Sequence, residues 1–223
     1  MRSKWINRVL SVALLFTTLT TSVSYTFTTA YAEEAGASTQ QSAQSGVSWP
    51  EAPEISAGNG ILIDADTGAI LYEKNAYTKC YPASTTKILT GENCSMDETV
   101  TFSRAAANSV TWEDSNLATK VGEQYTVEQA LYGLLLYSAN EIAYGLAEHV
   151  GGSLENFVEM MNARARELGA VNTHFANASG LYDPNHYTTA YDMAMIARGC
   201  YNNSTFVNID STEDTYTIGP TNL

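Results

Sequence analysis

The sequence predicts an α+β domain, because one β-hairpin signal is followed by a long region of helical periodicity. Residues 60–64 (GILID) and 69–73 (AILYE) are short β-prone runs. Asp66-Thr67-Gly68 lies between them and places a glycine where a tight turn needs a positive φ. The acidic spacing here also resembles the start of a calcium loop, but the bidentate glutamate that such a loop needs is missing. A hairpin is therefore the better interpretation.

Later segments have apolar residues three and four positions apart, which is typical of amphipathic helices. We expect one helix from Thr126 to about Tyr137 and a second through residues 142–150, which Gly151-Gly152 ends. A third helix should begin after a Ser153 cap and reach Gly169, and a fourth should begin at Thr189, where Asp192 completes a capping box. One hairpin before so many helices indicates that the central sheet is only partly present.

The first 32 residues have the pattern of an export signal. A cationic start precedes an apolar run over residues 9–16, and Ala30-Tyr31-Ala32 offers small residues for cleavage after Ala32. A transmembrane helix is the alternative, but the apolar run is shorter than the roughly 20 residues that a bilayer requires. Residues 33–48 are polar and small and predict a flexible leader, so the folded domain should occupy residues 49–223.

The charge of the chain argues against nucleic acid as a partner. Removal of residues 1–32 takes away three basic residues, so the net charge changes from 11 − 24 = −13 to 8 − 24 = −16. The remaining basic residues are scattered, whereas phosphate binding needs them clustered. Cys80, Cys94 and Cys200 lack metal-binding spacing and could form at most one disulfide, so we expect idle thiols and no metal site.

Ser84 and Lys87 form the first candidate catalytic element, in the run Pro82-Ala83-Ser84-Thr85-Thr86-Lys87. Residues three apart share one face of a helix, so the hydroxyl and the amine can touch. A serine becomes a good nucleophile when a base takes its proton, and a lysine is such a base once desolvation or a helix dipole lowers its pKa. This spacing is weak evidence alone, since it also arises by chance in surface helices.

The second candidate element is Ser138 and Asn140, on the short connection between the first two predicted helices. Ser138 could relay a proton from Lys87 to a leaving amine. The Asn140 carboxamide could accept from the lysine and donate to a substrate carbonyl, because it has both hydrogen-bonding roles. The alternative for this pair is structural, with Asn140 capping the helix that follows and Ser138 lying in the turn.

Both elements together, in this order, resemble the low-molecular-weight penicillin-binding proteins that act as D-alanyl-D-alanine carboxypeptidases. The resemblance extends from about residue 55 to the end and includes these runs: ILIDADTGAILYEKNA, YPASTTKILT, LLLYSANEIAYGLAEHVGGS and MNARARELGAVNTHFANASGLYDPNHYTTAYDMAMIARG. It implies the penicillin-binding-protein/β-lactamase-like transpeptidase fold, with the helical subdomain present and the central antiparallel sheet incomplete.

The resemblance also implies roles, a substrate and a location. Ser84 would be the acyl-forming nucleophile, Lys87 its general base, and Ser138 and Asn140 the second catalytic element, without a cofactor. The substrate would be a peptidoglycan pentapeptide ending in D-Ala-D-Ala, and β-lactam antibiotics would acylate the same serine. The protein would be exported to the cell wall or the outer face of the cytoplasmic membrane. His174 and His186 match no catalytic position of the family, which argues against a Ser-His-Asp triad.

The sequence departs from the family pattern in two places. None of the lysines begins the family's third motif, Lys-Thr-Gly, so we expect a C-terminally truncated domain with impaired activity, and any membrane anchor would belong to the missing part. The helix after Lys87 should end near Thr90, because Gly91-Glu92-Asn93 follows directly. The alternatives are an inactive peptide- or penicillin-binding module and a serine β-lactamase, although Ala139 stands where β-lactamases commonly have Asp.

Overall fold

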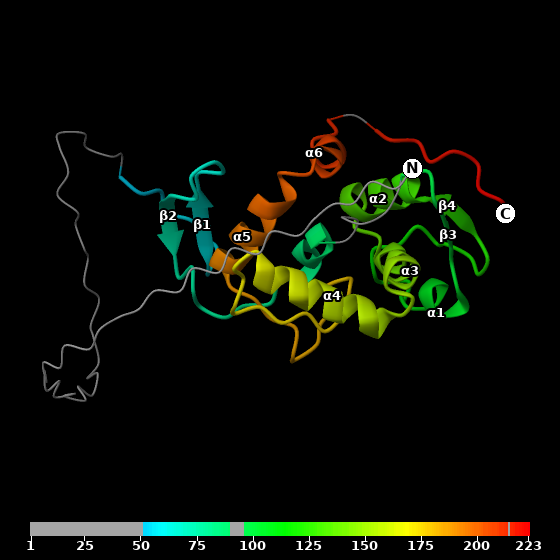
Figure 1. The fold of residues 1–223 in the computed structure, drawn as a ribbon, viewed down its shortest axis with the longest axis horizontal. Helices are drawn as coiled ribbons and strands as arrows, with labels where there is room; N and C mark the ends of the chain where they lie inside the picture. The colour runs from blue at the N-terminus through cyan, green and yellow to red at the C-terminus, as the bar shows by residue number, and fades with distance from the viewer. Residues whose placement is uncertain (1–50, 90–95, 214) are drawn as a thin grey trace, which may run out of the picture. The chain divides into compact units, whose positions relative to one another are not determined.

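The described part of the chain comprises residues 51–89, 96–213 and 215–223 of a computed structural model (Figure 1). It contains a two-stranded hairpin, a larger helical region and a second small two-stranded sheet. Four predicted features lie outside these residues: the export signal, the flexible leader, the end of the helix near Thr90, and Cys94. No helix within the described ranges is long and apolar enough to cross a membrane.

The predicted hairpin is confirmed. Strand β1 (Gly60–Ile63) pairs antiparallel with β2 (Ile70–Lys74). The turn is closed by Asp64, whose Oδ1 accepts hydrogen bonds from the Thr67 N–H at 2.7 Å and the Thr67 hydroxyl at 2.6 Å, and Gly68 adopts φ 76°. These bonds lower the pKa of Asp64. The acidic turn residue therefore stabilises the backbone of the hairpin itself.

The helical predictions are also confirmed, with small shifts at the ends. The α-helices of the described residues are α1 (Arg104–Ala107), α2 (Val127–Leu136), α3 (Asn140–Gly151), α4 (Leu154–Glu167), α5 (Ala190–Cys200) and α6 (Ser204–Asp210). Thr126, Ser153 and Thr189 cap α2, α4 and α5 as their hydroxyls accept backbone N–H bonds. Strands β3 (Thr99–Thr101) and β4 (Gln124–Thr126) form a second small antiparallel sheet that the sequence patterns did not predict.

The predicted capping box at α5 is only half right. Thr189 does accept from the Asp192 N–H at 3.0 Å, but the Asp192 carboxylate does not return the bond. Its Oδ2 instead accepts from the Asn172 N–H at 2.6 Å and the Thr173 hydroxyl at 2.8 Å. The buried carboxylate therefore holds the segment before α5 rather than closing the capping box.

Helix α3 lies at the centre of the helical region, in contact with α1, α2 and α4 (Figure 1). Its Ile142, Ala143, Leu146 and Ala147 are fully buried, as are Phe102 before α1 and Leu134 of α2. Burial of such side chains contributes about 1.5–3 kcal/mol each relative to exposure, less for alanine. This packing fixes the position of α3, and its first residue, Asn140, is one of the predicted site residues.

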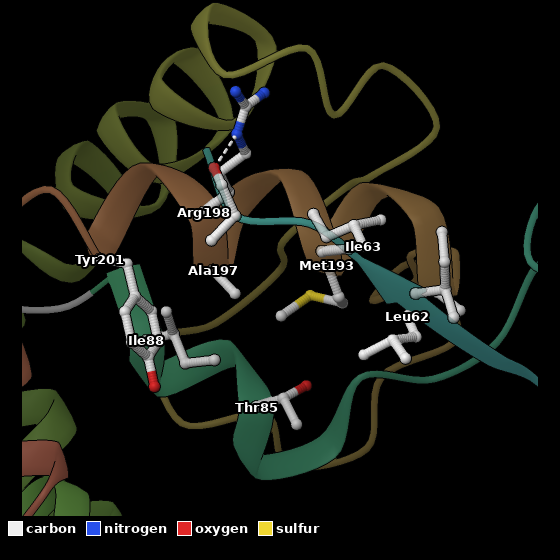
Figure 2. Close-up of a pocket in the computed structure, with 12 residues that line it drawn as sticks. Leu62, Ile63, Thr85, Ile88, Met193, Ala197, Arg198 and Tyr201 are labelled. Carbon is white, nitrogen blue, oxygen red and sulfur yellow. Dashed lines mark hydrogen bonds between the residues drawn. The ribbon is translucent and has the colours of Figure 1, made fainter. Parts of the chain in front are cut away.

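An apolar cavity of about 470 Å³ is lined by residues of the hairpin and of α5. Figure 2 shows Leu62 and Ile63 of β1, Thr85 and Ile88 of the short helix that follows the hairpin, and Met193 of α5 around it. Ser84 and Lys87 do not line the cavity, so it lies on a different face of that helix from the candidate catalytic pair.

Close packing of α3 on Phe102 yields the first prediction. A Cβ atom added at Gly145 would lie 2.2 Å from a ring carbon of Phe102, which is buried and cannot move aside. Gly145→Ala should lower the free energy of unfolding by about 1–3 kcal/mol, measured by urea denaturation. Helix propensity alone predicts the opposite sign, since alanine is favoured over glycine by about 1 kcal/mol.

Phe102→Leu supplies the control, because it removes the ring that blocks the added methyl group. In that background Gly145→Ala should cost much less, so the two substitutions should couple. Purely additive effects would contradict the proposed clash.

Candidate active site

Ser84 and Lys87 lie on a 3₁₀ helix, η1 (Ala83–Leu89), rather than on the α-helix that the spacing predicted. Residues i and i+3 eclipse in a 3₁₀ helix, so the two side chains still share one face. The Lys87 Nζ atom lies 3.3 Å from the Ser84 Oγ atom. Ser84 is exposed whereas Lys87 is only 2% exposed. A solvent-accessible hydroxyl therefore lies against a buried amine.

The Lys87 amine has two further partners. It donates to the Asn140 Oδ1 atom and to the backbone carbonyl oxygen of Ser179, each at 2.7 Å. Burial lowers its pKa from 10.5 to about 8, because an ammonium loses its hydration there. Both of these partners can only accept, whereas the Ser84 hydroxyl can also donate. Once the amine is neutral, its lone pair is therefore directed at Ser84.

Asn140 is held in the orientation that this contact needs. Its backbone N–H and its Nδ2 group both donate to the Ser115 carbonyl, at 2.9 Å and 3.2 Å. Since Nδ2 must donate there, the oxygen of the carboxamide points to Lys87. The capping alternative does not hold, because Ala139 is the N-cap of α3 and Asn140 is its first helical residue.

Ser138 is the single residue between the C-cap of α2, Tyr137, and the N-cap of α3, Ala139, and it has a left-handed conformation with φ 60°. The side chain is half-buried. No hydrogen bond joins its hydroxyl to Ser84 or Lys87 in the described structure, so the role of Ser138 in proton relay stays a prediction. The positive φ is unusual for serine and shows that the tight connection constrains this position.

The loop at residues 176–181 completes the site, and the sequence patterns assigned it no role. Gly180 has φ 86°, and a Cβ atom on it would lie 1.8 Å from the Ala83 carbonyl oxygen. The loop therefore packs backbone against backbone beside Ser84. The signal that could have found it is the Ser179-Gly180 pair in a stretch without periodicity, although such pairs also mark ordinary turns.

His186 contacts η1 on the buried side of this helix, through Thr86. Its Nδ1 atom accepts from the Ala176 N–H at 3.0 Å, so the proton resides on Nε2, which lies 2.8 Å from the Thr86 hydroxyl. Burial lowers the pKa of His186 from 6.5 to about 4, which keeps the ring neutral. His174 is bonded to the Asn185 carbonyl. Neither histidine contacts Ser84, in agreement with the structural roles predicted for them.

Metal ligation and disulfides have no support within the described residues. No three His, Cys, Asp or Glu side chains in those ranges are grouped so as to hold a metal ion. Cys80 is a free thiol, and burial raises its pKa.

Comparison with known proteins gives consistent matches. A family model described as D-alanyl-D-alanine carboxypeptidase matches residues 46–218. The chain is 38% identical over 152 residues to D-alanyl-D-alanine carboxypeptidase DacF of Bacillus subtilis, covering 64% of this chain and 38% of that relative. It is 34% identical over 174 residues to the D-alanyl-D-alanine carboxypeptidase of a Streptomyces species, covering 72% of this chain and 60% of the other.

Solved structures agree with the sequence matches. Penicillin binding protein 6B from Escherichia coli superimposes with a TM-score of 0.70 at 32% identity, over 77% of this chain and 58% of that one. DacD from Francisella tularensis gives 0.66 at 34% identity, over 75% and 42%. These similarities confirm the predicted fold class. The chain spans between about two fifths and three fifths of the length of these relatives.

The lowered pKa of Lys87 makes a second prediction, about stability. Between pH 8 and pH 10.5 the unfolded chain binds a proton at this lysine that the folded protein does not, so the free energy of unfolding should rise with pH across that window. Lys87→Met removes this titration while keeping an unbranched side chain. Urea unfolding of both proteins should show the wild type gaining stability relative to the variant from pH 8 to pH 10.5. A constant difference across the window would contradict the burial of the amine.

Proposed function

The chain belongs to the D-alanyl-D-alanine carboxypeptidase family of serine peptidases, and on that basis we propose that it removes the terminal D-alanine from peptidoglycan stem peptides. The observation that carries the proposal is the Ser84–Lys87 contact. An exposed hydroxyl lies 3.3 Å from a buried amine whose pKa of about 8 leaves a usable neutral fraction near pH 7. This is the pairing of nucleophile and base that acyl transfer requires.

The first half of the reaction transfers an acyl group to the protein. The Ser84 oxygen bonds to the carbonyl carbon between the two terminal D-alanines while its proton passes to the Lys87 nitrogen. The carbon–nitrogen bond then breaks, and the departing amine takes up a proton. We propose that Ser138 relays this proton from Lys87. Free D-alanine leaves, and the shortened peptide remains as an ester on Ser84.

Asn140 has the hydrogen-bonding capacity to orient the substrate. One of its two amide hydrogens is used on the Ser115 carbonyl, and the oxygen is used on Lys87, which leaves one donor hydrogen. We propose that this hydrogen binds an amide carbonyl of the peptide. Asn140 would then fix the base and the substrate relative to each other.

The second half of the reaction returns the serine. A water molecule attacks the ester carbon and gives up a proton to Lys87. The bond to the Ser84 oxygen then breaks, and Lys87 passes the proton to that oxygen, which restores the hydroxyl and the neutral amine. Penicillin would enter the same path, since its strained amide also presents a carbonyl carbon to Ser84. The ester would then persist wherever water cannot reach it well.

We propose that the protein acts outside the cytoplasm, where peptidoglycan lies. The support is the N-terminal pattern of residues 1–32, which precedes the first described residue of the domain. Expression in a bacterial host and intact-mass measurement of the exported product should give a chain that starts at Glu33. A cytoplasmic protein that retains Met1 would contradict this proposal.

Fluorescent penicillin provides the central test. The protein expressed from its complete reading frame should form a covalent adduct that Ser84→Ala abolishes, and Lys87→Met should slow acylation by about 10² to 10⁴-fold because the general base is lost. Thr85→Ala is the matched control, since the Thr85 hydroxyl bonds to the Pro82 carbonyl and not to Lys87. It should retain most of the labelling. An adduct that survives Ser84→Ala would contradict the assignment of the nucleophile.

Release of D-alanine from a pentapeptide mimic separates the remaining candidates. Release that depends on Ser84 supports a carboxypeptidase. An adduct without release indicates a binding module, and rapid hydrolysis of penicillin without release indicates a β-lactamase. We also propose that the 223 residues alone react at least about 10² to 10³-fold more slowly than a protein carrying a Lys-Thr-Gly strand, because such a strand adds an oxyanion donor.

A further inference from the structure

Asn177 organises the loop that supplies one of the three partners of the Lys87 amine. Its Oδ1 atom accepts from the Gly180 N–H at 2.7 Å, from the Ser179 N–H at 3.2 Å and from the Ser179 hydroxyl at 3.3 Å. Its Nδ2 group donates to the Leu181 carbonyl at 2.9 Å. One carboxamide therefore ties together three successive residues that have no helix or strand around them.

The bond from Gly180 matters most, because its N–H and the Ser179 carbonyl belong to the same peptide group. In a trans peptide these two groups point in opposite directions across one rigid plane. Asn177 binds the N–H end of the plane and Lys87 binds the oxygen end at 2.7 Å. Rotation of the peptide that turned the oxygen away from Lys87 would also break the bond to Asn177. A bond to the N–H end further strengthens the oxygen as an acceptor.

A second restraint fixes the loop against η1. The space beside Gly180 is filled by the Ala83 carbonyl, so the glycine is required by this close approach as well as by its positive φ. The Ser179 residue is fully buried and Asn177 is 9% exposed. Water is therefore poorly placed to replace any bond that a substitution removes.

We infer that Asn177 is a positioning residue for the catalytic lysine: through the Ser179–Gly180 peptide it holds the carbonyl that directs the Lys87 lone pair at Ser84. The inference rests on the proposed function of Ser84 and Lys87. The titratable side chains on the surrounding elements include His186, which bonds to Thr86 of η1, and Glu141, which follows Asn140 on α3. They also include Asp183, which lies near His186, and the exposed Tyr81 and Tyr182. The fall in the Lys87 pKa comes from burial.

Two substitutions and one control test the inference. Asn177→Ala removes all four bonds. Asn177→Asp keeps the acceptor oxygen but places a negative charge at the far end of the same peptide. Asn162→Ala is the matched control: Asn162 pins the preceding part of the same connection through both backbone groups of Phe175, at 2.8 Å each, and does not touch the Ser179–Gly180 peptide. The folded fraction of each variant is measured by urea denaturation, and all comparisons are made where that fraction is complete.

The first readout is the penicillin acylation rate as a function of pH. Asn177→Ala should lower the rate about 10- to 100-fold at every pH, since a base that is displaced by a fraction of an ångström loses this much. Asn177→Asp should shift the midpoint of the profile upward by about one unit, because an anion favours the ammonium form, and should recover toward the wild-type rate at alkaline pH. Asn162→Ala should retain the wild-type rate and midpoint.

The second readout is the pKa of Lys87 itself, followed by NMR of its labelled side chain in the same proteins. It does not depend on turnover, so it separates failure of the inference from failure of the proposed function. Absence of any Ser84 adduct in the wild type would overturn the proposed function. Two results would overturn the role of Asn177. One is that Asn177→Ala and Asn162→Ala have equal effects on both the acylation rate and the pKa of Lys87. The other is that Asn177→Asp changes neither the midpoint of the rate profile nor the pKa of Lys87.

Discussion

The burial of one amine is the constraint on which the site depends. An ammonium at Lys87 is costly to keep away from water, so the fold must surround it with acceptors or leave it neutral. The structure does part of each: three oxygen atoms lie within hydrogen-bonding distance, and the pKa falls to about 8. Because two of the three oxygens cannot donate, the same arrangement that stabilises the buried cation also directs the neutral amine at the serine.

Each oxygen comes from a different part of the chain, and each is fixed by its own local structure. Ser84 is placed by the 3₁₀ geometry of η1, which brings residues three apart onto one face. Asn140 is placed by its position at the start of α3 and by the Ser115 carbonyl. The Ser179 carbonyl is placed by a loop without regular structure, which is why the side chain of Asn177 has to provide the bonds that a helix or strand would otherwise supply.

A second buried polar group connects the site to the helical core. Glu141 is 1% exposed, and its Oε1 atom accepts from the Leu117 N–H at 2.6 Å and the Thr119 hydroxyl at 3.0 Å. These bonds hold the segment that presents the Ser115 carbonyl to Asn140. The tight packing of α3 around Gly145 fixes the helix that carries both side chains. The geometry of the candidate site and the core packing are thus joined through a single helix, so loss of packing around Gly145 weakens the orientation of the Asn140 amide.

The sequence by itself determined the local features: the hairpin around its glycine turn, the amphipathic helices with their caps, and the Ser84–Lys87 pair, because each depends on residues a few positions apart. Spacing correctly placed Ser84 and Lys87 on one face even though it predicted the wrong kind of helix. Only the tertiary structure decided the orientation of Asn140, the use of Asp192 outside its capping box and the part played by Asn177 and Ser179. Those outcomes depend on contacts between segments about 20 to 90 positions apart, as from Asp192 to Asn172 and from Lys87 to Ser179, or on backbone atoms that are the same in every residue. No local pattern therefore encodes them.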